Sequence, residues 1–97
     1  MAFVQIIRFD TSKFDEMKAL GDEWEAAIGS DRTAVRRLLC KDRDSENGYF
    51  NIVFFDSYEE AMENSNNPVT QEFSTKMMAL GDGEPTFYNL DVLSDDS

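Results

Sequence analysis

A few polar side chains interrupt stretches that are otherwise apolar, and these residues are the best suited to chemistry. On the expected strands they are Gln5, Arg36, Asn51, Tyr88 and Asn89. A polar group buried among apolar neighbours needs a hydrogen-bond partner, and a ligand held between a sheet and its helices would be one. Trp24 adds an indole ring that can stack on such a ligand. These residues form the candidate ligand-binding set.

The same residues also have a structural interpretation. Gln5 and Asn51 can bond each other or the backbone, and Arg36 can pair with an acid at the edge of a subunit. Trp24 can anchor its helix in the core. A packed interior would favour this interpretation, whereas a cavity lined by Trp24, Tyr88 and a polar group would favour ligand binding.

Other kinds of catalytic site lack the residues that they need. The chain has no histidine, so no imidazole can activate a serine, a threonine or the single cysteine, Cys40. Glu59, Glu60 and Glu63 cluster in the sequence, but they are typical of a solvated helix face rather than of a metal site. No glycine-rich loop follows a strand and opens a helix, so nucleotide binding has no support. We expect neither a metal nor another cofactor.

Composition and charge narrow the class of protein. The 97 residues fit one domain with a polar tail at 93–97, and a net charge of −11 argues against nucleic acid as a partner. The single cysteine suits a reducing compartment. The N-terminal stretch lacks the features of a signal peptide, and no apolar run approaches the roughly 20 residues of a membrane helix. These features predict a cytoplasmic protein with no membrane partner.

The elements that must position the candidate residues follow a strand–helix pattern that occurs twice. Strands are expected at 3–9, 33–41, 49–55 and 86–93, and helices at 13–28, Ser57 to Asn64, and Pro68 to Leu80. The turn Asn47-Gly48 joins the second and third strands as a hairpin, and Asn67-Pro68 breaks the second helical region. The order βαββαβ predicts an α+β, ferredoxin-like fold with a four-stranded antiparallel sheet, whose first and third strands are central.

The expected strands are apolar on both faces, although both helical regions cover only one face of such a sheet. The other face must also be buried, and a second copy of the sheet would bury it. We therefore expect a homodimer in which two sheets form a shared barrel. The charges at the two edges are complementary, since the second strand carries Arg36, Arg37 and Lys41, and the fourth strand and tail carry Asp91, Asp95 and Asp96.

Four segments carry a resemblance to a known superfamily: FVQIIRFDTS, GYFNIVFFDSYEEAMENS, NPVTQEF and EPTFYNLDV. They resemble the dimeric α+β barrel superfamily, and more narrowly its antibiotic biosynthesis monooxygenase-like members and a group of uncharacterised actinobacterial proteins. Heme-degrading relatives in that superfamily use a histidine on the second-half helix, near Thr75 here, and an asparagine on the first strand, near Ile7 here. Because this chain has neither, the resemblance implies no heme.

Taken with the resemblance, the candidate set predicts a small dimeric barrel protein that binds a small apolar or aromatic ligand between sheet and helices. The resemblance also implies an alternative, a cofactor-independent monooxygenase acting on a phenolic polycyclic substrate. In that case Arg36 would hold an anionic oxygen that Asn51 or Asn89 orients. Trp24 or Tyr88 would stack on the ring. A second alternative is an assembly module with a filled core.

Overall fold

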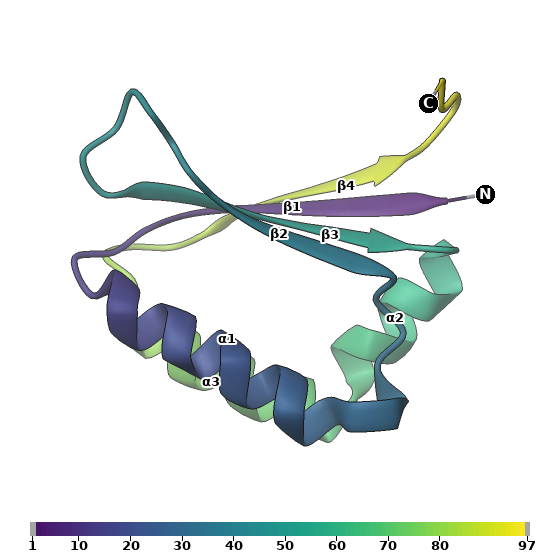
Figure 1. Ribbon diagram of the computed structural model, residues 1–97, viewed down its shortest axis with the longest axis horizontal. Coiled ribbons are helices and arrows are strands. Elements are labelled where there is room, and N and C mark those ends of the chain that lie inside the picture. Colours follow the sequence, from purple (N-terminus) through teal and green to yellow (C-terminus); the bar gives the residue numbers. More distant parts are fainter. Residues whose placement is uncertain (1, 97) are drawn as a thin grey trace.

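The computed structural model describes residues 2–96, which fold around one antiparallel sheet with the strand order β2-β3-β1-β4. The elements are β1 (Phe3–Asp10), α1 (Phe14–Ile28), the short 3₁₀ helix η1 (Gly29–Asp31), β2 (Arg36–Lys41), β3 (Gly48–Phe55), α2 (Tyr58–Asn66), α3 (Pro68–Leu80) and β4 (Thr86–Asp91). Figure 1 shows α1, α2 and α3 together on one side of the sheet. The expected ferredoxin-like α+β fold, with the first and third strands at the centre, is confirmed.

Local capping explains why the second helical region forms two helices. Ser57 caps α2 by accepting a hydrogen bond from the Glu60 backbone N–H at 3.1 Å. Asn67 then caps α3 by accepting from the Val69 N–H at 2.9 Å, and Pro68 takes the first helical position, where its missing N–H is tolerated. The break expected near Pro68 is therefore confirmed.

Thr11 joins the start of α1 to the end of α3. Its side chain is buried, with 1% of the residue exposed. The hydroxyl oxygen accepts a hydrogen bond from the Lys13 N–H at 2.9 Å and donates to the Leu80 carbonyl at 2.8 Å. One hydroxyl thus fixes the distance between the two long helices at this end of the molecule.

The interior is packed near both ends of the sheet. At one end a buried cluster connects the sheet to α2, and its members are Phe3, Ala34, Val53, Phe55 and Ala61. Toward the other end Tyr49 stacks on Phe9 and on Phe14, with ring centroids 5.7 and 4.5 Å away. Such aromatic contacts add to the stabilisation from burial. The middle of the strands, between these two regions, is where the site lies.

Two strands are shorter than the sequence predicts. β2 begins at Arg36 rather than at residue 33, because the Thr33 hydroxyl donates to the Glu60 carbonyl at 2.8 Å and ties that segment to α2. β4 ends at Asp91 rather than at residue 93. Val92 still donates to the Ala2 carbonyl at 2.9 Å, but the neighbouring strand β1 begins only at Phe3.

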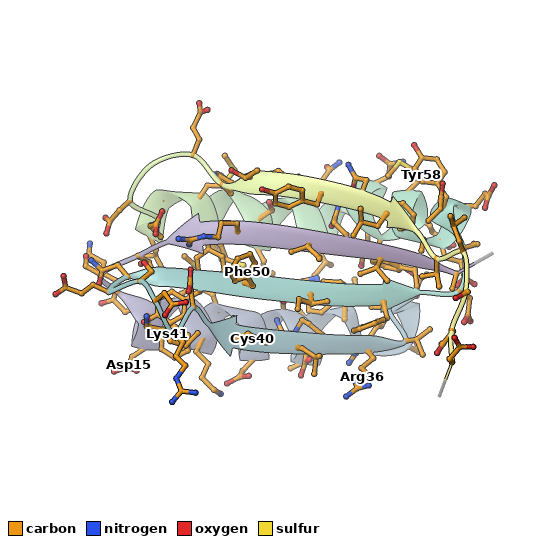
Figure 2. The ribbon with its side chains drawn as sticks, turned by 90° about the horizontal axis from the view of Figure 1, so that it is seen from above. Asp15, Arg36, Cys40, Lys41, Phe50 and Tyr58 are labelled. Atoms are coloured by element: carbon orange, nitrogen blue, oxygen red, sulfur yellow. The ribbon has the colours of Figure 1, made fainter. Side chains whose placement is uncertain are left out.

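The side of the sheet away from the helices is mostly apolar, and we call it the outer face. Strand alternation places on it Val4, Ile6, Leu38, Cys40, Phe50, Ile52, Phe54, Tyr88 and Leu90. Figure 2 looks onto this face and shows Cys40 and Phe50 on the neighbouring strands β2 and β3. Tyr88 and Leu90 are 48% and 45% exposed. Both faces of the sheet are thus apolar, as the sequence predicts.

Candidate functional site

A cavity lies between the middle of the sheet and the helices α1 and α3. It has two chambers, of about 390 and 110 Å³. Six residues line both chambers and so mark the passage between them: Ile7, Arg37, Asn51, Ser74, Met77 and Phe87. The space is partly open to solvent, since Phe87 and Met78 in its lining are exposed. A pocket of this size, lined by apolar groups and a few polar ones, is typical of a small-ligand site. A space of this kind favours ligand binding over an assembly module with a filled core.

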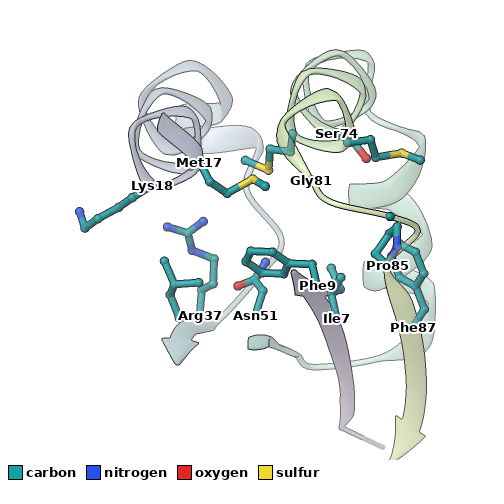
Figure 3. A pocket seen from close by; sticks show the side chains of 15 residues that line it. Ile7, Phe9, Met17, Lys18, Arg37, Asn51, Ser74, Gly81, Pro85 and Phe87 are labelled. Atoms are coloured by element: carbon teal, nitrogen blue, oxygen red, sulfur yellow. The ribbon is translucent and has the colours of Figure 1, made fainter. Parts of the chain in front are cut away.

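The two chambers differ in polarity. The smaller chamber, drawn in Figure 3, is mostly apolar, with walls that include Phe9, Met17, Leu39, Met78 and Pro85. The larger chamber has a polar wall from the end of α2 and from α3, formed by Asn64, Ser65, Thr70, Gln71, Ser74 and Thr75. A ligand that fills both chambers would have one apolar end and one end that bears hydrogen-bonding groups.

The strand register builds the floor of the cavity from two rows of side chains. Residues that face each other across the four strands form the row Phe87–Ile7–Asn51–Leu39, and the next row is Asn89–Gln5–Val53–Arg37. Side chains alternate between the two faces of a strand, so both rows point toward the helices. Asn51 is the single polar member of the first row.

Asn51 carries a polar atom that the described part of the fold leaves unsatisfied. Its Oδ1 atom is buried and has no hydrogen-bond partner among the described residues. An unpaired buried acceptor costs about 1–3 kcal/mol. Figure 3 shows the Asn51 side chain rising from the sheet into the smaller chamber, and the residue lines the larger chamber as well. A ligand that donates a hydrogen bond to this oxygen would recover the cost.

Trp24 is fixed in the cavity wall by hydrogen bonds. Its Nε1 donates to Thr70 Oγ1 at 3.0 Å, and that hydroxyl in turn donates to Asn64 Oδ1 at 3.4 Å. The residue is 7% exposed and lines the larger chamber. Because α1 carries Trp24 and α3 carries Thr70, the bond also joins the two helices. Trp24 can therefore both anchor α1 in the core and contact a ligand in the larger chamber.

The arginine in the cavity is Arg37, and the expectation that Arg36 would hold the ligand is wrong. The Arg37 guanidinium lies 5.9 Å from the Trp24 ring, and its Nη2 forms an ion pair with Glu25 Oε1 at 3.4 Å. Gly21 on α1 makes room for this group, since a Cβ there would lie 2.9 Å from Arg37 Nη1. Close approach of the guanidinium therefore explains a glycine in the middle of a helix.

The structure brings three of the six candidate residues to the cavity. Gln5, Trp24 and Asn51 line the larger chamber. Asn89 lies on the same side of the sheet, on the exposed edge strand β4, and its Oδ1 accepts a hydrogen bond from Gln5 Nε2 at 3.1 Å. Gln5 thus finds its partner in Asn89, and the expected bond between Gln5 and Asn51 is not what satisfies it.

The remaining two candidates, Arg36 and Tyr88, lie on the outer face. The Arg36 guanidinium is 5.7 Å from the centre of the Phe54 ring, which shares that face. Neither residue shares a face with the cavity floor, so a ligand held there would meet Arg37 instead of Arg36. Arg37 shares a face of β2 with Leu39, which could have indicated that it points toward the core. Arg36 shares the other face with Leu38, however, and Leu38 is equally apolar. Alternation within β2 therefore does not choose between the two arginines.

Within residues 2–96, no group of three or more His, Cys, Asp or Glu side chains is placed to hold a metal ion. No helix in that part of the chain combines the length and apolar character needed to cross a membrane. At the cavity, the available groups include the amides of Asn51 and Gln5, the indole of Trp24 and the guanidinium of Arg37. Together they can bind, orient and electrostatically stabilise a small molecule.

Comparison with solved structures shows which proteins share the fold. A variant of SnoaB, a cofactor-independent oxygenase from Streptomyces nogalater, is 17% identical, with a TM-score of 0.82 over 97% of this chain and 95% of that one. A predicted antibiotic biosynthesis monooxygenase from Caulobacter crescentus is 12% identical, with a TM-score of 0.84 over 96% and 91% of the two chains. A protein from Mycobacterium tuberculosis is 15% identical, with a TM-score of 0.81 over 100% of both.

Sequence comparison adds nothing to this, because no family model matches the chain and no curated protein matches its sequence. At identities of 12% to 17%, structural similarity establishes a shared fold and not a shared chemistry. The chain has the ferredoxin-like α+β fold that is also found in antibiotic biosynthesis monooxygenase-like proteins.

Proposed function

We propose that this protein binds a small aromatic molecule bearing a hydroxyl group in the cavity between the sheet and the helices α1 and α3. The observation that carries the proposal is the Asn51 side chain. Its Oδ1 is buried and has no partner among residues 2–96, and the residue belongs to the lining of a chamber of about 390 Å³. A ligand hydroxyl would donate to this oxygen.

The rest of the cavity suits the body of such a ligand. Ile7, Met77 and Phe87 offer apolar contacts along the passage between the chambers. Methionine is flexible and polarizable, so it adapts to an aromatic edge. The Trp24 indole, fixed by its bond to Thr70, belongs to the lining of the larger chamber and adds an aromatic contact there.

Calorimetric titration with para-cresol and para-xylene tests the hydroxyl directly. The two molecules differ only in that a hydroxyl replaces a methyl of similar size, so their shape and apolar contacts are matched. We expect para-cresol to bind about tenfold or more tightly, because satisfying a buried acceptor recovers about 1–3 kcal/mol. Asn51→Leu should abolish this preference, and Asn89→Leu on the exposed edge strand should keep it. Equal affinities in the unaltered protein would refute the proposal.

We propose further that the protein works as a homodimer in which two outer faces pack together. Residues such as Leu38, Phe50 and Ile52 form a continuous apolar surface on neighbouring strands. A large exposed apolar surface of this kind marks an interface. Paired sheets bury such surfaces when they stack about 10 Å apart. If the basic strand β2 of one copy meets the acidic β4 and tail of the other, dimer affinity should fall at high salt.

A second candidate function is cofactor-independent oxygenation of a phenolic polycyclic substrate. It is favoured by the likeness to SnoaB, together with Asn51 and Trp24 in one largely apolar cavity. In such a reaction the ionised substrate itself gives electrons to O₂. A ring CH₂ becomes a carbonyl, and the second oxygen atom leaves as water.

Anthrone, whose enol form is a tricyclic phenol, tests this second candidate in an oxygen electrode. Consumption of one O₂ for each anthraquinone formed, at a rate that Asn51→Leu reduces, would support oxygenation. Asn89→Leu serves as the control variant, since Asn89 lies at the exposed edge strand. Oxygen uptake no faster than in buffer would count against an enzyme and leave ligand binding as the function.

A further inference from the structure

The charge around the cavity differs from the charge of the molecule as a whole. The chain has 20 Asp and Glu residues against 9 Lys and Arg, for a net charge of −11. Yet none of the described side chains that line either chamber is an Asp or a Glu, whereas Arg37 lines both. Lys18 also lines the smaller chamber, and its amine pairs with Asp22 at 3.0 Å. The side chains that line the cavity thus include cations and no acid, although the protein as a whole is acidic.

The charge of Arg37 is only partly balanced by its neighbours. Glu25 Oε1 lies 3.4 Å from Arg37 Nη2 and 3.6 Å from Arg32 Nη1, so one carboxylate serves two guanidinium groups. Arg37 is the more buried of the two, with 17% of its side chain exposed against 30% for Arg32. A cation in a poorly solvated site favours an opposite charge close to it.

The guanidinium of Arg37 is also held in position for another partner. The helix backbone at Gly21 and the Trp24 ring confine it, and Figure 3 shows it standing between the sheet and Met17 of α1. A guanidinium has five N–H donors. Its contact with Glu25 at 3.4 Å is longer than the usual charge-assisted bond of about 2.7–2.9 Å, so most donors stay available.

We propose that the ligand of this cavity is a hydroxylated aromatic acid, whose carboxylate binds Arg37 while its hydroxyl donates to Asn51. This inference rests on the binding function proposed above and adds the charge of the ligand to it. One ligand can reach both groups, because Arg37 pairs with Val53, which is two residues from Asn51 on the same face of β3. A carboxylate fits better than a phenolate, since carboxylic acids are ionised near neutral pH and phenols are not.

Titration with para-hydroxybenzoate and para-hydroxybenzamide tests the inference. The two probes have the same shape and the same hydroxyl, and they differ in charge. We expect the acid to bind about tenfold or more tightly, because hydrogen bonds between charged groups are about twice as strong as neutral ones. Arg37→Gln should remove the preference. Arg36→Gln removes the same charge from the opposite face of β2 and should keep it.

Two features keep this test decisive. Glu25→Gln removes the carboxylate that competes for Arg37, so it should increase the preference for the acid, and a decrease would contradict the inference. The comparison of acid and amide in the unaltered protein needs no variant, so it stands even if Arg37→Gln does not fold. Equal binding of acid and amide overturns this inference and leaves the binding function intact. If neither probe nor para-cresol binds, the binding function fails and the inference fails with it.

Discussion

At the scale of single residues, the cavity retains groups that cost the protein stability. Asn51 Oδ1 is buried without a partner among residues 2–96. Arg37 lies beside the Trp24 indole and shares the Glu25 carboxylate with Arg32. Exceptions to the pairing of buried polar groups are rare, and they tend to occur at functional sites. Substitution of such a residue should therefore change stability and binding in opposite directions.

Asn51→Leu keeps the approximate volume of the side chain and removes its unpaired oxygen. We expect the free energy of unfolding to rise by about 1–3 kcal/mol, while the affinity for para-cresol falls. Urea denaturation measures the first quantity and calorimetry the second. Asn89→Leu is the matched control, because Asn89 is exposed and already bonded to Gln5. A destabilised Asn51→Leu protein would mean that Asn51 has a partner within the fold.

Gly21→Ala separates the stability of α1 from the position of Arg37. Alanine favours a helix over glycine by about 1 kcal/mol, but the new Cβ would lie 2.9 Å from Arg37 Nη1 and push the guanidinium aside. Since these effects oppose each other, we expect the free energy of unfolding to change by less than about 1 kcal/mol. The preference for para-hydroxybenzoate over its amide should fall. An unchanged preference would show that the exact placement of the guanidinium does not matter.

At the scale of elements, the cavity depends on how the helix pair is held against the sheet. Thr11 links Lys13, just before α1, to Leu80 at the end of α3, and Met77 and Met78 in that last part of α3 line the smaller chamber. Loosening this link should therefore weaken both the fold and the chamber.

Thr11→Val replaces the linking hydroxyl with a methyl of similar size. We expect a loss of about 1–3 kcal/mol in the free energy of unfolding, since the Lys13 N–H and the Leu80 carbonyl both lose a partner. Thr75→Val is the control, because the Thr75 hydroxyl donates to the Gln71 carbonyl on an exposed part of α3. If chemical denaturation gave the same loss of stability for Thr11→Val and Thr75→Val, the Thr11 link would stabilise the fold no more than an exposed hydrogen bond does.

Elements and their order can be predicted from the sequence where the signal is local. Ser57 and Asn67-Pro68 mark helix starts by their own chemistry, and the structure confirms both. The face on which a side chain lies is harder to predict. In the six-residue strand β2, apolar residues fall on both faces, so only pairing with β3 decides that Arg37 faces the helices. Asn51 can be recognised in the sequence as a polar residue in an apolar strand. Whether its Oδ1 finds a hydrogen-bond partner depends on how the side chains of α1 and α3 pack above it, which the sequence does not reveal.

At the scale of the whole molecule, the two faces of the sheet differ in what lies against them. One face forms the floor of the cavity, and the outer face is the surface on which we propose that a second copy of the chain packs. Figure 1 shows the helices together on one side, so residues 2–96 supply no helix that covers the other face. The proposed dimer would then leave each cavity within its own subunit.

Ile52→Lys places a charge in the middle of the outer face, on the central strand β3. Burying an unpaired ammonium costs several kcal/mol, so we expect the dimer dissociation constant to rise on the order of 100-fold or more. Analytical ultracentrifugation measures this change. Glu59→Lys, on the exposed surface of α2, makes a larger change of charge and should leave the dimer intact. An unaltered protein that stays monomeric at micromolar concentration would contradict the dimer itself.

The central claim is that the cavity is a ligand site completed by Asn51, and a crystal structure of the protein with para-hydroxybenzoate tests it most directly. The account predicts the aromatic ring between the sheet and the helices α1 and α3, with the ligand hydroxyl within hydrogen-bond distance of Asn51 Oδ1 and the carboxylate on Arg37. A structure in which Met77 and Phe87 fill the space, and a protein group already bonds Asn51 Oδ1, would contradict it.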